Sequence, residues 1–92
     1  MWRRLTTELA GRPCVVRRVR QITDDDGDRC YGIADLAKHE IYIEDCLHGR
    51  ELLQYLLHEA LHIQRPRASE RWVDNTSREL AALIKRAGLL RE

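Results

Sequence analysis

Residues 49–64, GRELLQYLLHEALHIQ, decide the fold, because their leucines recur at the spacing of one helix face. This periodicity predicts an amphipathic helix, with one apolar face against a core and one solvated face. Pro66 follows two residues later, and the residue before a proline avoids the α region. We therefore expect the helix to end near Gln64.

A second helix is expected from about residue 69 to residue 87. Ser69 is a suitable N-cap, since its hydroxyl can accept a hydrogen bond from a free N–H of the first turn, and Gly88 is a suitable stop. Apolar and small residues step through the segment by three and four positions, which predicts one face toward the core. This stripe consists of Val73, Thr76, Leu80, Leu83 and Ala87.

The first half of the chain is expected to form a short helix and a small sheet. Leu5 and Leu9 lie four residues apart, which indicates a helix over residues 2–10. β-branched or alternating apolar residues predict three strands, with an Asp-Gly turn between the first two. The predicted strands are 14–22, 29–34 and 39–44. The expected fold class is α+β: an N-terminal helix, a small three-stranded, mainly antiparallel sheet and two long helices in a single domain, residues 1–92.

Length and composition bound the class of protein. The chain has 92 residues, of which 43% are hydrophobic and 34% charged, which is typical of one small globular domain and excludes a multi-domain enzyme or a transporter. No run approaches 18 apolar residues, and the N-terminus lacks the apolar stretch of a signal peptide, so we expect a cytoplasmic protein without a membrane segment. Cys14, Cys30 and Cys46 form no Cys-x-x-Cys pair, and we expect them to be reduced and mostly buried.

The net charge of +1 hides a basic N-terminal end. Residues 1–23 contain six arginines and one acid, whereas acids outnumber bases in residues 24–92. One interpretation is a nucleic-acid-binding patch. We favour a solvated surface offset by acids nearby, because no aromatic residues are interleaved with the arginines, so nucleic acid is not the expected partner. The arginines are Arg3, Arg4, Arg12, Arg17, Arg18 and Arg20.

The helix predicted over 49–64 carries the motif His58-Glu59-x-x-His62. Residues four apart share one helix face, so both imidazoles can bind one metal ion. Glu59 is rotated about 100° from His58 and rises only ~1.5 Å along the axis, so its carboxylate can reach a metal-bound water without binding the metal. The alternative is that both histidines face solvent or a neighbouring helix and that Glu59 is a surface charge.

A catalytic zinc site normally has three protein ligands and one open position. Glu70 is the favoured third ligand, because it opens the second helix eight residues after His62, beside the apolar stripe. Asp74, one turn later, is the competing candidate, and is otherwise expected to accept a hydrogen bond from the second ring nitrogen of His58. The alternatives are that Glu70 is a first-turn acid favoured by the helix dipole and that Asp74 faces solvent.

This combination, His58-Glu59-x-x-His62 followed by Glu70-x-x-x-Asp74, resembles the gluzincins, the zinc metallopeptidases typified by thermolysin. The order of elements is also similar to the minigluzincins and to small metallopeptidase-like proteins of phages and bacteria. The resemblance implies a Zn²⁺ cofactor, with His58, His62 and Glu70 as metal ligands. It also implies Asp74 as the support of His58 and Glu59 as the general base.

The same resemblance implies a zincin-like fold whose last strand borders the cleft. Residues 39–44 are the expected strand, and an extended peptide or protein substrate would pair beside it. The implied function is a zinc-dependent peptidase that hydrolyses peptide bonds with a metal-activated water. The alternative is a zinc-binding interaction domain with little or no proteolysis, because the chain has no His or Tyr after His62 to stabilise an oxyanion. A monomer is expected by default.

Overall fold

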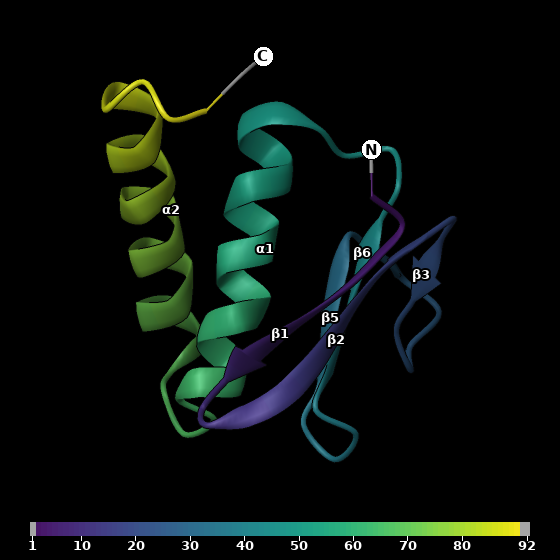
Figure 1. Cartoon of the computed structure of the whole chain (residues 1–92). Helices are drawn as coiled ribbons and strands as arrows, with labels where there is room; N and C mark the ends of the chain where they lie inside the picture. Colours follow the sequence, from purple (N-terminus) through teal and green to yellow (C-terminus); the bar gives the residue numbers. More distant parts are fainter. Residues whose placement is uncertain (1, 91–92) are drawn as a thin grey trace.

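A computed structural model describes residues 2–90 and divides them into six strands and two helices (Figure 1). All the strands precede both helices along the chain. The strands are β1 (Arg4–Leu9), β2 (Arg12–Val19), β3 (Ile22–Thr23), β4 (Arg29–Cys30), β5 (Gly32–Asp35) and β6 (Glu40–Glu44). The helices are α1 (Gly49–Gln64) and α2 (Glu70–Arg86).

The N-terminal segment is a strand, so the helix predicted over residues 2–10 is wrong. Leu5 and Leu9 are four residues apart, and this spacing also places both on one face of a strand, because strand side chains alternate with a period of two. Ala10 and Gly11 both have positive φ, which returns the chain in a tight turn toward β2. Pairing with β2 in a hairpin therefore decides the conformation of this segment.

Four strands form one mixed sheet in the order β1-β2-β6-β5, and β3 and β4 form a separate two-stranded sheet. β1 pairs antiparallel with β2, β2 runs parallel to β6, and β6 pairs antiparallel with β5. The predicted three-stranded, mainly antiparallel sheet is therefore wrong. The parallel pair of β2 and β6 joins segments that are separated along the chain by three other strands, β3, β4 and β5, and local sequence patterns do not record such a pairing.

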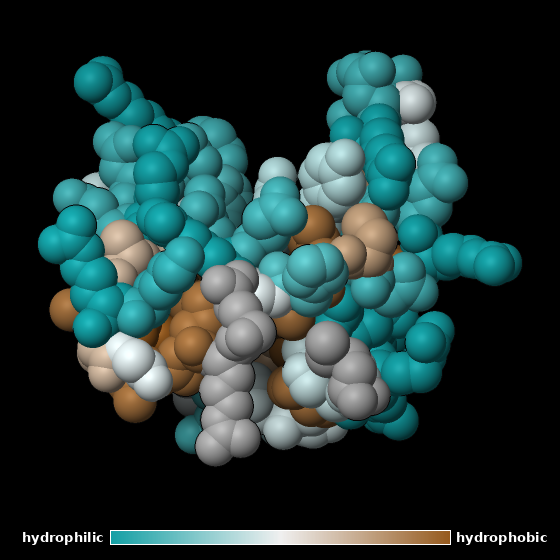
Figure 2. Space-filling view, turned by 90° about the horizontal axis from the view of Figure 1, so that it is seen from above, coloured by the Kyte–Doolittle hydropathy of each residue, from teal (hydrophilic) through white to brown (hydrophobic). Residues whose placement is uncertain are grey.

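Helix α1 lies between the sheet and α2, so the molecule has three layers (Figure 1). The main core lies between the sheet and α1. Its buried residues are Cys14, Val16, Ile41, Ile43, Leu47 and Ile63. On its other side, α1 is covered by α2, whose Val73, Ser77 and Ala81 are fully buried. Of the stripe predicted for this helix, Val73 is buried but Leu80 and Leu83 are exposed, so the predicted core-facing stripe is wrong at those two positions. Seen from above, apolar side chains gather near the middle of the molecule, with hydrophilic side chains around them (Figure 2).

The helix ends match the sequence expectations. The Ser69 hydroxyl accepts a hydrogen bond from the backbone N–H of Trp72 at 3.1 Å, and Gly88 follows α2 with a φ of 75°. The Asp-Gly turn is also present, since Asp24 Oδ1 accepts two backbone N–H bonds at 2.9 Å each. Within residues 2–90, neither helix is long and apolar enough to cross a membrane.

The cysteines only partly follow their expectation. All three are free thiols, and Cys14 is buried. Cys30 is half-buried, however, and Cys46 is exposed, which corrects the expectation that most of them are buried.

Two charged side chains of the first half of the chain are buried and structural. Glu44 is fully buried and receives hydrogen bonds from Arg29, at 2.6 Å from Nη2 and 3.1 Å from Nε. This charged donor holds the pKa of the Glu44 carboxyl at about 2, below its usual range. Arg18 is 5% exposed and donates to the carbonyl oxygens of Asp45 and Leu47, which ties β2 to the loop before α1.

Candidate metal centre

Three of the predicted site residues meet where α1 and α2 lie side by side. His58 and His62 lie one turn apart on α1, and Glu70 is the first residue of α2. Glu70 Oε1 lies 2.8 Å from His58 Nε2, and Glu70 Oε2 lies 3.2 Å from His62 Nε2. The two Nε2 atoms are 3.3 Å apart. The turn at Pro66 thus brings the third predicted ligand back onto the helix face that carries the first two.

These three side chains offer a donor set that fits zinc. Zinc bound tetrahedrally at ~2.0–2.1 Å from imidazole nitrogen and carboxylate oxygen places its ligand atoms roughly 3.3 Å from one another. One ligand atom from each of His58, His62 and Glu70 lies within 4.8 Å of the others. The cluster is therefore a candidate metal centre. The same distances also suit direct hydrogen bonds between the imidazoles and the carboxylate.

The exposure of the three side chains leaves one side of the candidate centre open. The His58 and His62 side chains are 17% and 21% exposed, whereas the Glu70 side chain is 73% exposed. A catalytic zinc site requires such an opening for water or substrate, while a purely structural zinc site is closed by a fourth protein ligand. Within residues 2–90, no fourth His, Cys, Asp or Glu joins this group.

Glu59 lies next to the candidate centre but points toward the sheet. Its side chain packs against β5, and the residue is only 7% exposed. Burial, and secondarily the negative charge of Glu70, raise the pKa of the Glu59 carboxyl to about 7. Glu59, His58, His62 and Glu70 line one open cleft of about 370 Å³. The motif thus places a buried carboxyl group beside the candidate ligands.

Gly32 on β5 is a site residue that the sequence analysis missed. A Cβ atom at this position would lie 2.9 Å from Glu59 Oε2, closer than real Cβ atoms approach a neighbour, and 3.1 Å from Ile43 Cδ1, which is tighter than most real contacts. Only glycine therefore lets β5 approach the Glu59 carboxylate this closely. A glycine inside a predicted strand is a known signal of close backbone approach, and this signal was present in residues 29–34.

Asp74 lies near His58 without a hydrogen bond to it. His58 Nδ1 and Asp74 Oδ1 are 3.7 Å apart, which is beyond hydrogen-bond range. The other carboxylate oxygen accepts a hydrogen bond from Arg78 Nη2 at 2.9 Å. Asp74 therefore lies on the expected side of His58, but its carboxylate is hydrogen-bonded to Arg78, which lies one turn further along α2.

The strand that borders the cleft is β5, which corrects the expectation for residues 39–44. β6 lies inside the sheet, paired with β2 on one side and with β5 on the other, so it has no free edge. β5 is the last strand of the sheet, and Gly32, Ile33 and Ala34 line the cleft beside the candidate metal centre. The error concerns the order of the strands in the sheet: β5 pairs with the outer side of β6, so the last strand along the chain is not the last strand of the sheet.

Comparison with protein families, with curated proteins and with solved structures gave no match to this chain.

Proposed function

We propose that this chain is a zinc-dependent hydrolase of peptide bonds. One observation carries the proposal: three donor atoms of the kind that zinc prefers converge within 4.8 Å, in the same cleft as a buried carboxyl group. His58, His62 and Glu70 would hold the ion. A bound zinc ion supplies Lewis acidity, which polarises a carbonyl group and acidifies water.

Glu59 is the proposed general base and acid. It lies one residue from a ligand, so it is held close to the ion without an orientation that lets it bind. Its contact with Gly32 fixes the carboxylate on the sheet side of the cleft. From there it would accept a proton from the attacking water and pass it to the leaving amine.

The edge of β5 is the proposed binding site for the substrate. The backbone N–H of Glu44 donates to Tyr31 O, so Tyr31 belongs to a hydrogen-bonded pair with β6. Bonding alternates along an antiparallel strand, and Gly32 and Ala34 therefore direct their N–H and C=O groups toward the free edge. An extended peptide can add there as a further strand, beside the candidate metal centre.

The proposal is tested with Glu59→Gln, which keeps the size of the side chain but removes its basicity. Peptide-library hydrolysis by the zinc-loaded wild type should be abolished by a chelator and restored by zinc. Glu59→Gln should bind zinc normally and lose at least ~100-fold in turnover. Glu79→Gln, the same change at an exposed position of α2, is the matched control and should keep wild-type activity.

Two results decide against the proposal. If Glu59→Gln retains proteolysis, the assigned role of Glu59 is wrong. If the wild type binds zinc, loses its folded structure on chelation and hydrolyses no peptide, the chain is a zinc-stabilised interaction domain.

A further inference from the structure

The opposite edge of the sheet, formed by β1, carries backbone groups that point outward. β1 is the first strand of the sheet order and pairs only with β2. The backbone N–H of Arg18 donates to Arg3 O at 2.8 Å, which makes Arg3 and Arg18 a hydrogen-bonded pair of this ladder. Because such pairs alternate, the N–H and C=O groups of Arg4, Thr6 and Glu8 point away from β2, toward the free edge. A strand edge of this kind is a template for another strand.

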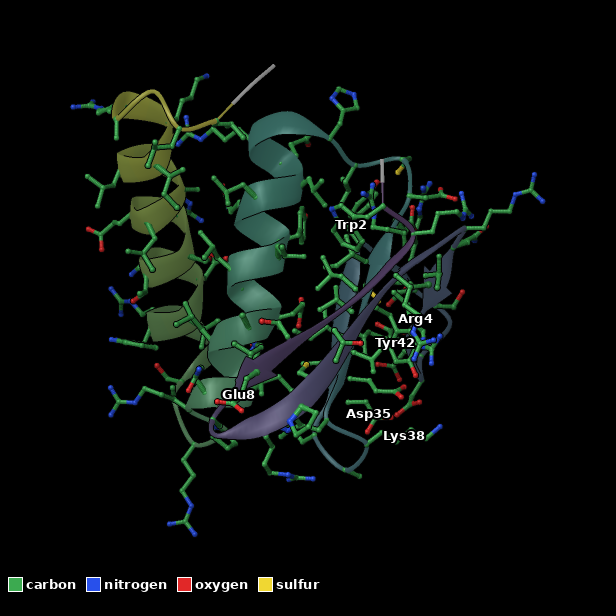
Figure 3. All side chains as sticks on the ribbon, viewed as in Figure 1. Trp2, Arg4, Glu8, Asp35, Lys38 and Tyr42 are labelled. Carbon is green, nitrogen blue, oxygen red and sulfur yellow. The ribbon has the colours of Figure 1, made fainter. Side chains whose placement is uncertain are left out.

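The charges along this edge are unsatisfied within one copy. Arg4 stands directly opposite Arg17 in the β1–β2 ladder, and like charges in this position repel. Glu8 stands opposite Pro13. Among residues 2–90, neither the Arg4 nor the Glu8 side chain has an ion-pair partner. Figure 3 shows the two side chains near opposite ends of β1.

We propose that two copies of this chain associate through β1, in antiparallel register about a two-fold axis at Thr6. In this register Arg4 of each copy lies directly opposite Glu8 of the second copy, and Thr6 lies opposite itself. All three residues have outward-facing backbone groups, so each of these pairs exchanges both of its backbone hydrogen bonds. The dimer then contains two Arg4–Glu8 ion pairs, one on each side of the axis, and the two sheets become one continuous sheet.

The apolar face of β1 supports the same partner. Leu5, Leu9 and Val16 line a hollow of about 280 Å³ between the first two strands and α1, whose Leu53 and Leu57 form its other side. In the proposed register the inner faces of both copies lie on the same side of the joined sheet. Leu5 then lies beside Thr7 of the second copy, and diagonally beside its Leu9, so the apolar rows of both copies cover each other at the seam.

The proposed interface is compatible with the cleft. β1 and β5 are the two opposite edges of the sheet, so the second copy at β1 leaves the β5 edge and the candidate metal centre accessible. Pairing through β5 would instead close the cleft. The dimer does not depend on zinc or on the function of the cleft.

Charge exchange tests the register. Sedimentation equilibrium of the full chain, from low micromolar to about 1 mM, should show a monomer–dimer equilibrium. Arg4→Glu and Glu8→Arg should each raise the dissociation constant at least roughly tenfold, because each creates two like-charge pairs. The double variant should recover the wild-type constant. Arg20→Glu and Glu79→Arg, the same charge changes at exposed positions elsewhere, are controls and should leave it unchanged.

A cross-link tests the axis. In a Cys46→Ser background, Thr6→Cys should form a disulfide-linked dimer on mild oxidation, since the Cα atoms of a hydrogen-bonded pair lie ~5.5 Å apart. Thr7→Cys, whose side chain points to the inner face and lies off the axis, should not. The proposal is overturned if the wild type stays monomeric up to about 1 mM, if the single charge variants dimerise like the wild type, or if Thr7→Cys cross-links as readily as Thr6→Cys.

Discussion

Two residues on different elements determine the shape of the cleft wall. Gly32 has no side chain, which leaves room for the Glu59 carboxylate, and this carboxylate lies on the sheet side of the candidate ligands. The carboxylate can therefore stay close to the cleft while being almost inaccessible to bulk water. At the scale of single residues, this contact links the motif on α1 to the sheet.

Gly32→Ala is expected to destabilise the protein by about 1–3 kcal/mol, because the new methyl group overlaps Glu59 and Ile43. In a Glu59→Ala background part of this cost should disappear, since two of the three close atoms, Glu59 Oε2 at 2.9 Å and Glu59 Cγ at 3.1 Å, are then absent, while Ile43 Cδ1 at 3.1 Å remains. Urea denaturation of the wild type, both single variants and the double variant measures the coupling. Equal costs of Gly32→Ala in both backgrounds would contradict the contact.

The proximity of the candidate ligands was predictable from the sequence, whereas the contact of Gly32 with Glu59 was not. His58, Glu59 and His62 lie on one helix at fixed spacing, and Glu70 opens the next helix, so local periodicity was enough to bring them together. The partner of Glu59 comes from a strand 27 positions earlier, and that contact depends on the sheet order. Only the glycine itself carried a signal of it.

At the scale of elements, the start of α2 decides where the third candidate ligand lies. Glu70 is the first helical residue and directly follows the N-cap Ser69, so the geometry of the cap sets the direction of its side chain. The first turn also contains the fully buried Val73, so the cap and the packing of Val73 both hold it in place. The cap therefore helps to position the third candidate ligand as well as to stabilise the helix.

Ser69→Ala should cost about 1 kcal/mol of stability, because the N–H of Trp72 loses its hydrogen-bond acceptor. It should also weaken zinc binding, as the first turn of α2 frays and Glu70 loses its fixed position. Ser69→Asp, which keeps a capping oxygen, is the matched comparison and should retain both properties. Thermal denaturation and competitive zinc titration measure the two effects, and unchanged zinc affinity in Ser69→Ala would separate the cap from the site.

The elements also differ in how far local patterns predict them. The periodicity of α1 and α2, the N-cap of α2 and the residues that end each helix were enough to predict that both helices exist, but not which face of α2 is buried, since Leu80 and Leu83 are exposed. β1 carries Leu5 and Leu9 at a spacing that fits both a helix and a strand, and only its pairing with β2 separates the two. Short edge strands therefore remain the part of this fold that sequence periodicity does not determine.

Across the whole molecule, the core is small, and the buried carboxylate of Glu44 forms an ion pair with the half-exposed Arg29. Glu44 and Arg29 connect β6 to β4, and through the backbone N–H of Ile22 to β3. This pair thus attaches the small two-stranded sheet to the four-stranded one. Its loss should affect the stability of the fold as a whole, without a direct effect on the cleft.

The Glu44 pair predicts an acid-labile fold. Its folded pKa of about 2 lies below the usual value, so the pair stabilises the protein above about pH 4.5, and this contribution is lost as the pH falls toward 2. Glu44→Gln, which cannot ionise, should lower the stability at pH 7 by about 1–3 kcal/mol and flatten the decline below pH 4.5. Denaturation at a series of pH values, with Glu79→Gln as control, measures this; an unchanged acid slope would contradict it.

In the proposed site, His58, His62 and Glu70 hold one zinc ion in the cleft that β5, α1 and the start of α2 line. The most direct measurement is the zinc content per chain after loading and exhaustive dialysis, for the wild type, His62→Gln, Glu70→Gln and the control Glu79→Gln. We expect one zinc per chain in the wild type and in Glu79→Gln, and a loss of zinc in His62→Gln and Glu70→Gln. A wild type that retains no zinc, or a Glu70→Gln variant that retains it fully, would contradict the proposed site.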